Sequence, residues 1–436
     1  MNRRDDYSYA ASHGEQARQY GLGVDQEKVR TYNRQLIVTY LREHSPALRV
    51  RMARDLGLSR ATVSNIVKDL IDERWVYEGE KRQTTTVGGK RATEIAFNGD
   101  AGHIVGVDIG RSRLRLYLTN LANRLLDRWV GPFDTALAWE KGLGEITRQI
   151  EGLVEAHLGG WETVRGIGIG MPGAPDRRAQ LISPPALANW RDVDIPEQVR
   201  KLLRLPADFP VYLEKDANLG ALGESRYGAG RGIRNMIYVK LSTGIGAGLI
   251  LNGELFRGEH GLAGEFGHLH IPFDEALSAE HARCPSCGQH GCLEALAGLQ
   301  AIVRDAGPAR FLDEPITSEH MREIVKEAQA GEEQSRTALV RAGKRIGAAI
   351  GSALINGYNP ALILLDGGSI RPGRDDEVIN TLLLAQIQQS AQQTCLPASW
   401  SGTRILPGQL GDDAVGLGAI ALVIERDPAL NMPASA

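Results

Sequence analysis

The sequence predicts an α/β protein with mixed sheets, preceded by a small helix-rich module. From residue 103 onward, short apolar runs typical of buried strands alternate with long helical stretches. Residues 30–73 instead show three helical segments in close succession. The chain has 436 residues, which is more than one hydrophobic core ordinarily holds, so at least two folding units are expected.

The N-terminal module is predicted to contain three helices. The first ends before Ser45-Pro46, the second covers residues 49–56, and Gly57 provides the turn that follows it. Ser59 is a good N-cap for the third helix. One face of this third helix is predicted to be buried, because apolar residues have i, i+3, i+4, i+7 spacing at Val63, Ile66, Val67, Leu70 and Ile71.

Two short strands, residues 75–78 and 92–97, are predicted next, on either side of a polar loop at 81–91. A helix-turn-helix followed by such a hairpin is typical of a winged DNA-binding module, whose second helix enters the major groove. Lys90 and Arg91 in the loop would contact the DNA backbone. Side chains on the helix that can bond to phosphates and base edges are Ser59, Arg60, Thr62, Ser64, Asn65 and Lys68. The alternative is a small helical interaction domain with a solvated polar face.

The charge distribution agrees with a separate DNA-binding module. Residues 31–98 contain 12 Lys and Arg against 8 Asp and Glu, whereas the whole chain has a net charge of −3. A basic module on an acidic body favours a nucleic-acid partner for the module. The polar N-terminal segment shows no signal peptide, and no apolar run reaches the length of a membrane span, so a cytoplasmic protein is expected.

Three of the four cysteines, Cys284, Cys287 and Cys292, fall within nine residues. In a long, cysteine-poor chain such clustering indicates a metal site rather than a disulfide framework. Four soft or borderline ligands satisfy a structural zinc ion. Three histidines compete for the fourth position: His268, His270 and His290. The alternative is a group of buried thiols without metal.

Three glycine-rich segments follow predicted strands, which is a pattern that lets backbone N–H groups approach phosphate oxygens. These segments are residues 108–110, 242–248 and 366–368. Asp216 also follows a strand, where a carboxylate can accept a proton from a sugar hydroxyl, and Glu265 and Glu294 flank the cysteine cluster. The alternative for each carboxylate is a solvated or salt-bridged surface acid.

Taken together, these motifs resemble those of the ROK family of repressors, open reading frames and kinases. The resemblance extends from about residue 30 to 425 and rests on residues 166–173, 216–218, 242–248, 265–268 and 287–294. It implies an actin/hexokinase-like fold in which a sugar cleft separates two lobes. Within the family, the chain is similar to the repressors of N-acetylglucosamine, xylose and glucose metabolism.

The resemblance also implies roles for individual residues. Asp216 matches the catalytic base of the family's kinases. Structural zinc would be held by His268, Cys284, Cys287 and Cys292. Sugar contacts are implied for Gly173, Asn189, Asp216, Glu265, His268 and Glu294.

The chain departs from the kinase pattern at three positions. Arg111 replaces the glycine that admits phosphate, and Lys215 stands where the kinases have asparagine. Ala186 takes the place of a sugar-binding asparagine, for which Asn189 is a candidate substitute. Phosphoryl transfer depends on positioning of the nucleotide phosphates, so the first departure argues against enzymatic activity.

We therefore expect a sugar-responsive transcription regulator, most simply a repressor of carbohydrate metabolism genes, that binds a double-stranded operator as a homodimer or homotetramer. One alternative is an ATP-dependent sugar kinase that carries a DNA-binding domain; another is a regulator controlled by a protein partner. The expected segments are a polar tail (1–28), a winged helix-turn-helix (29–98), a ROK domain (102–428) and a terminal tail (429–436).

Overall fold

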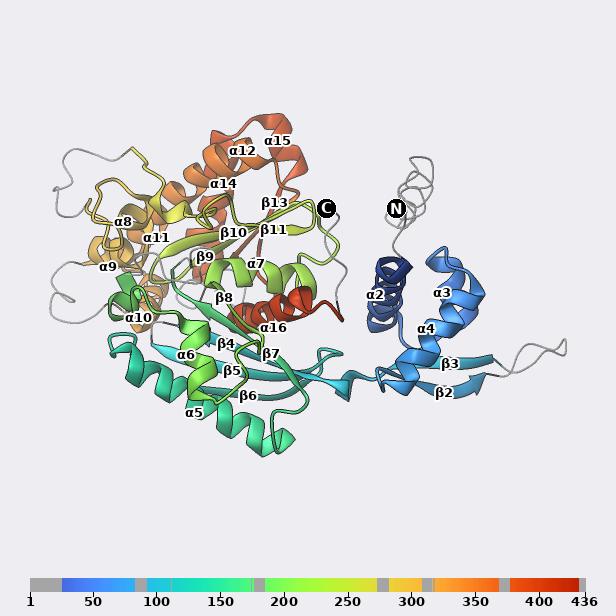
Figure 1. The fold of residues 1–436 in the computed structure, drawn as a ribbon. Coiled ribbons are helices and arrows are strands. Elements are labelled where there is room, and N and C mark those ends of the chain that lie inside the picture. The colour runs from blue at the N-terminus through green and yellow to red at the C-terminus, as the bar shows by residue number, and fades with distance from the viewer. Residues whose placement is uncertain are drawn as a thin grey trace.

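The structure is a computed structural model (Figure 1), and the N-terminal module lies at one end of the molecule in that view. It describes residues 26–82, 92–110, 112–173, 175, 185–272, 282–307, 316, 318–367 and 377–430. Within these residues, no helix is both long and apolar enough to cross a membrane.

The N-terminal module is a winged helix-turn-helix. Its elements are α2 (Gln26–His44), β1 (Ala47–Leu48), α3 (Arg49–Asp55), α4 (Arg60–Asp72), β2 (Val76–Arg82) and β3 (Ala92–Phe97), with strand order β1-β3-β2. The Ser59 hydroxyl accepts a hydrogen bond from the Thr62 backbone N–H at 3.0 Å, which confirms the predicted N-cap. Val63, Ile66, Val67 and Leu70 are buried as predicted, and Ile71 is half-buried.

Two five-stranded sheets form the larger part of the protein. The first has the order β6-β5-β4-β7-β8 and the second β11-β10-β9-β12-β13. The strands of the first are β4 (His103–Ile109), β5 (Arg113–Asn120), β6 (Leu125–Pro132), β7 (Val164–Met171) and β8 (Val211–Lys215). Those of the second are β9 (Met236–Leu241), β10 (Ile245–Leu251), β11 (Glu254–Phe256), β12 (Leu362–Asp366) and β13 (Arg404–Pro407). In each sheet the first three strands are antiparallel and the last two add in parallel, so the two lobes share one topology.

Helices α7 (Asp216–Tyr227) and α16 (Ala414–Arg426) pack against each other and lie between the sheets (Figure 1). Glycines let these two helices pack closely on the neighbouring strands. A Cβ on Gly248 of β10 would lie 2.3 Å from the Ala217 carbonyl oxygen, and a Cβ on Gly168 of β7 would lie 2.2 Å from that of Ala419. Gly248 therefore belongs to a strand that packs on a helix, not to the phosphate loop predicted for residues 242–248.

The remaining helices cover the outer faces of the two sheets and build the second lobe's insertion. On the first lobe they are α5 (Trp139–Leu158) and α6 (Ile195–Leu202). On the second lobe they are α8 (Leu293–Ala297), α9 (Leu299–Ala306), α10 (Ser318–Gln329), α11 (Glu333–Ala349), α12 (Asn356–Tyr358), α13 (Glu377–Ile379), α14 (Ala385–Thr394) and α15 (Pro397–Gly402). Buried side chains from these helices and from the strands form the core of each lobe.

Both expected terminal boundaries differ from the structure. Helix α2 begins at Gln26, inside the segment predicted as tail 1–28. Leu430 is fully buried, and its carbonyl oxygen accepts from the Arg42 guanidinium at 3.2 Å. The Gln35 side chain likewise donates to the Pro428 carbonyl oxygen at 2.6 Å. Leu430, predicted as part of the tail from residue 429, therefore belongs to the packed part of the chain, because the residues after α16 contact α2.

Candidate functional site

A cavity of about 660 Å³ opens where the two lobes meet, and both lobes supply its lining. Asp108 at the end of β4, Asp216 at the start of α7 and Lys240 on β9 all line it. Glu265 and Glu294 line it from the second lobe. The carboxylates that the sequence analysis selected from three distant segments thus face one space, as the resemblance implied.

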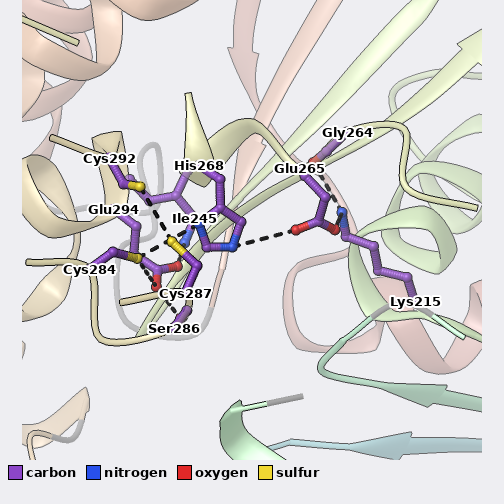
Figure 2. Close-up of polar contacts among 10 residues, drawn as sticks. All are labelled: Lys215, Ile245, Gly264, Glu265, His268, Cys284, Ser286, Cys287, Cys292 and Glu294. Atoms are coloured by element: carbon purple, nitrogen blue, oxygen red, sulfur yellow. Dashed lines mark hydrogen bonds and ion pairs between the residues drawn. The ribbon is translucent and has the colours of Figure 1, made fainter. Parts of the chain in front are cut away.

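The cysteine cluster stands beside this cavity. The ligand atoms of His268, Cys284, Cys287 and Cys292 all lie within 4.8 Å of one another (Figure 2). The Cys287 and Cys292 sulfurs are 3.6 Å apart, and the Cys284 sulfur is 3.7 Å from His268 Nδ1. Of the three histidines considered, His268 is the one that completes the cluster, so these four residues could hold a metal ion.

The chemistry of the donors fits a soft or borderline cation. Burial raises the pKa of the Cys284 thiol, and burial together with the neighbouring thiols raises the pKa of Cys292 to about 12. Without a cation these sulfurs would therefore hold their protons, whereas a bound metal ion takes thiolates.

Two contacts tie the cysteine cluster to the cavity. Glu294 Oε2 accepts from the Ile245 backbone N–H at 2.9 Å, and its Oε1 accepts from the Ser286 hydroxyl (Figure 2). A Cβ on Gly244 would lie 2.4 Å from Glu294 Oε2, so only glycine allows this approach. On the other side, His268 Nε2 faces Glu265 Oε2 at 3.7 Å. A metal ion on His268 Nδ1 would therefore fix the orientation of a side chain that faces a cavity carboxylate.

Two lysines pair with cavity carboxylates. Lys215 Nζ donates to Glu265 Oε1 at 2.6 Å and to the Gly264 carbonyl oxygen at 3.0 Å (Figure 2). Lys240 Nζ donates to Asp216 Oδ2 at 2.7 Å. The sequence analysis noted Lys215 as a departure and missed Lys240, although a lysine inside an otherwise apolar strand was a visible signal.

Asp108 is a buried acid at the cavity wall. Its Oδ2 accepts from Arg115 Nη1 at 3.1 Å, and burial raises its pKa against the attraction of Lys240 and Arg115. Among the residues that the structure describes, its buried Oδ1 has no hydrogen-bond partner. The motif at residues 108–110 thus contributes a carboxylate to the cavity.

Of the other predicted site residues, one lines the cavity and another lies outside its lining. Gly173 lines the cavity, with a φ of 107°. Asn189 is exposed and lies outside the cavity lining, and its amide donates to the Ala136 carbonyl oxygen at 2.8 Å. The structure describes the backbone of Ala186 but not its side chain. Predictions outside the described residues concern Arg111, Gly368, Lys90 and Arg91.

The DNA-contacting residues predicted at and around α4 lie away from the buried face of this helix. The exposed members are Ser59, Arg60, Ser64, Asn65 and Lys68. Thr62 is half-buried, and its hydroxyl shares a hydrogen bond with the Ser59 hydroxyl at 2.8 Å. Helix α4 therefore offers a continuous polar surface at the helix-turn-helix.

The fold and the cavity can now be compared with those of known proteins. Residues 104–426 match the ROK family. The chain belongs to this family. It is 28% identical over 409 residues to the xylose repressor of Bacillus subtilis, covering 92% of this chain and 97% of that repressor. It is 28% identical over 339 residues to the glucokinase of Thermotoga maritima, covering 74% of this chain and 98% of the glucokinase.

Among solved structures, too, a regulator aligns over nearly the whole chain and a kinase over about three quarters of it. A ROK transcriptional regulator, a homologue of the E. coli MLC protein, aligns over 92% of this chain and 98% of its own, with a TM-score of 0.73 and 23% identity. A ROK glucokinase from Streptomyces griseus, solved with glucose and AMPPNP, covers 74% of this chain and 99% of its own, with a TM-score of 0.59 and 28% identity. The actin/hexokinase-like fold predicted from the resemblance is confirmed.

Proposed function

We propose that this chain is a sugar-responsive transcriptional repressor of carbohydrate metabolism genes, whose effector binds in the cavity between the lobes. The observation that carries the proposal is the winged helix-turn-helix attached to a ROK domain in one chain. Matched xylose repressors cover 90–92% of the chain, whereas matched glucokinases cover 74–75%. The difference is close to the length of the N-terminal module.

In this proposal, α4 lies in the major groove and two copies of the chain read two half-sites of an operator. Arg60 and Asn65 would contact base edges, and the other exposed polar residues of α4 would contact phosphates. Lys90 and Arg91 of the wing would contact the backbone. An oligomer is required because one module offers too small a DNA surface for specific binding.

The test is the ratio of operator to random-DNA affinity in Arg60→Ala and Asn65→Ala. Each variant is expected to lose about 1–3 kcal/mol of discrimination. Lys201→Ala serves as the control, because Lys201 is an exposed lysine on α6. Wild-type discrimination in both variants would place the recognition surface elsewhere.

The effector site is proposed to comprise Gly173, Asp216, Glu265, His268 and Glu294. Asn189, which lies outside the cavity lining, would contact the effector only after its own segment rearranges. Carboxylates that line a polar cavity suit the hydroxyl groups of a sugar. A structural zinc ion on His268, Cys284, Cys287 and Cys292 would fix the second-lobe part of this site.

Helix α16 offers a route from the cavity to the DNA-binding module. Val415, near its N-terminal end, lines the cavity, as does Asp412 just before the helix. About 14 Å further along the helix from Val415, Ile424 belongs to the same hydrophobic cluster as α2 residues such as Ile37. Because Leu430 after the helix also packs on α2, a shift of α16 on effector binding would reorient the module.

An effector can change operator affinity only by binding one lobe arrangement better than another. We expect the best-binding sugar to change operator affinity by about 1–3 kcal/mol in wild type. Glu265→Ala should abolish this response, and Glu254→Ala, an exposed acid on β11, should retain it. Operator affinity that no bound sugar changes would favour control by a protein partner instead.

The second candidate function, a sugar kinase, is favoured only by the matched glucokinases. Asp216 occupies the position of the kinase base, but both of its oxygens are engaged, by Lys240 and by the Ala217 backbone N–H. ATP-dependent phosphorylation of a hexose that Asp216→Asn abolishes would promote this function over the repressor.

A further inference from the structure

Three charged residues from three elements share the wall of the cavity. Asp108 ends β4 of the first sheet, Asp216 begins α7, and Lys240 lies on β9 of the second sheet. All three line the cavity. Lys240 Nζ is 2.7 Å from Asp216 Oδ2, and its charge also acts on Asp108. Lys240 is therefore paired with one carboxylate and acts electrostatically on a second, and the topology brings the two from separate parts of the chain.

Two carboxylates that face one cavity repel each other and require a cation. Asp108 is 4% exposed, its Oδ1 has no partner among the described residues, and the charge of Asp216 adds to the effect of burial in raising its pKa. Oxygen-rich sites of this kind are the usual binding sites of Mg²⁺ and Mn²⁺. Among the described residues, Arg115 reaches Asp108 Oδ2 only, so the buried Oδ1 of this cavity-lining residue keeps no hydrogen-bond partner.

The Lys240 ammonium supplies positive charge at this place. Burial disfavours its charged form, but the charges of Asp216 and Asp108 outweigh burial and raise the pKa of Lys240. The side chain is only 17% exposed and lies on a strand paired on both sides, so its stem is held in position. A lysine so fixed can neutralise the carboxylates permanently, without an ion taken from solution.

We propose that Lys240 is a tethered cation that takes the place of a divalent metal ion between Asp108 and Asp216, so that the cavity binds its ligand without such an ion. Lys240 is then the residue that allows the cavity to bind its ligand without a divalent metal ion. It also holds the Asp216 carboxylate in an ion pair, in which the carboxylate is a poor acceptor for a hydroxyl proton. Its test measures ion binding alone, so the inference can fail or hold independently of the repressor function.

The test measures Mn²⁺ binding to the zinc-loaded full-length protein by calorimetry and by the electron paramagnetic resonance signal of the free ion. Wild type is expected to show no saturable Mn²⁺ binding that depends on Asp216. Lys240→Met and Lys240→Gln should gain one Mn²⁺ site. Its affinity should exceed any residual Mn²⁺ affinity of wild type by about tenfold or more, because a positive charge within contact distance of Asp216 is removed. The double variant Lys240→Gln with Asp216→Asn should lose this gain.

Lys215→Met is the matched control, because it removes an ammonium group from the same cavity but from the Glu265 side. It should gain no Mn²⁺ site. If Lys215→Met gained as much Mn²⁺ binding as Lys240→Met, the gain would follow from the overall charge of the cavity, and the proposal would be overturned. The absence of any Mn²⁺ gain in folded Lys240 variants would also overturn the proposal. Mn²⁺ binding to wild type that depends on Asp216 would overturn it as well, and this can be measured even if a Lys240 variant fails to fold.

Discussion

The two lobes share one strand order, yet they hold their site residues in different ways. In the first lobe, Asp108 and Lys215 stand at the ends of strands β4 and β8, and Asp216 begins the following helix. In the second lobe, Glu265 and His268 lie on the segment between β11 and α8, where the described residues form a short 3₁₀ turn, Phe266–His268, and isolated β-bridges such as that of His270 with Cys292. Continuous strand ladders hold the first group, whereas the second group is held by isolated backbone contacts and by side-chain contacts with the cysteine cluster.

This difference follows from the connections in each lobe. The first lobe passes from β6 to β7 through residues 133–163, which contain one long helix. The second lobe passes from β11 to β12 through residues 257–361, which include the cysteine cluster and several helices. A duplicated framework therefore carries a large insertion in one half, and a segment with isolated β-bridges in place of a continuous strand ladder needs another source of order. The predictions below test whether a metal ion provides it.

The largest effect is expected from Cys292→Ala. Wild type should contain about one zinc ion per chain, and the variant should lose it together with about 4 kcal/mol or more of unfolding free energy. Metal analysis and denaturant unfolding measure both. Cys395→Ala is the matched control, because Cys395 is also buried in the second lobe but lies outside the cluster. Carefully prepared wild type without zinc would remove the proposed difference between the lobes.

A smaller effect is expected from truncating one core position in each lobe. Ile150 on α5 and Ile346 on α11 are both fully buried, so each change to alanine should cost about 2–5 kcal/mol. Ile346 belongs to the same hydrophobic cluster as Phe266 and Leu293, which flank the metal ligands. Ile346→Ala should therefore speed zinc loss to a chelator, and Ile150→Ala should leave that rate unchanged. Equal rates in the two variants would mean that the insertion holds its metal without support from the core.

The parts of this structure that the sequence predicted are those set by neighbouring residues. The buried face of α4 follows from helical spacing, and three of the four cluster ligands lie within nine residues. The shared topology of the lobes escaped prediction, because strand order depends on contacts between distant segments that no local pattern records. Lys240 was missed for the same reason, since its meaning depends on Asp216 and Asp108. Gly248 was instead assigned a role that the structure does not support, because a glycine that lets its strand pack on a helix was interpreted as part of a phosphate loop.

The smallest effect is expected at an ion pair between the lobes. Arg257 Nε, just after β11, donates to Glu214 Oε2 on β8 at 2.6 Å. Glu214 is buried, but its other oxygen accepts from the Lys215 backbone N–H and from the Asn218 amide. Loss of the arginine would leave a buried carboxylate with two donors in place, so the cost should be moderate.

We expect Arg257→Met to lower the free energy of unfolding by about 1–2 kcal/mol, because the arginine is one-third exposed and solvent weakens the pair. Arg404→Met, at an exposed arginine on β13, should change it by less than about 0.5 kcal/mol. Since Arg257 joins the lobe with the cysteine cluster to the first lobe, its loss should also favour a more open arrangement of the lobes and weaken effector binding, with zinc content unchanged. If Arg257→Met instead reduced zinc content, the segment after β11 would depend on the first lobe as well as on the metal, and the contrast between the lobes would be smaller than the fold suggests.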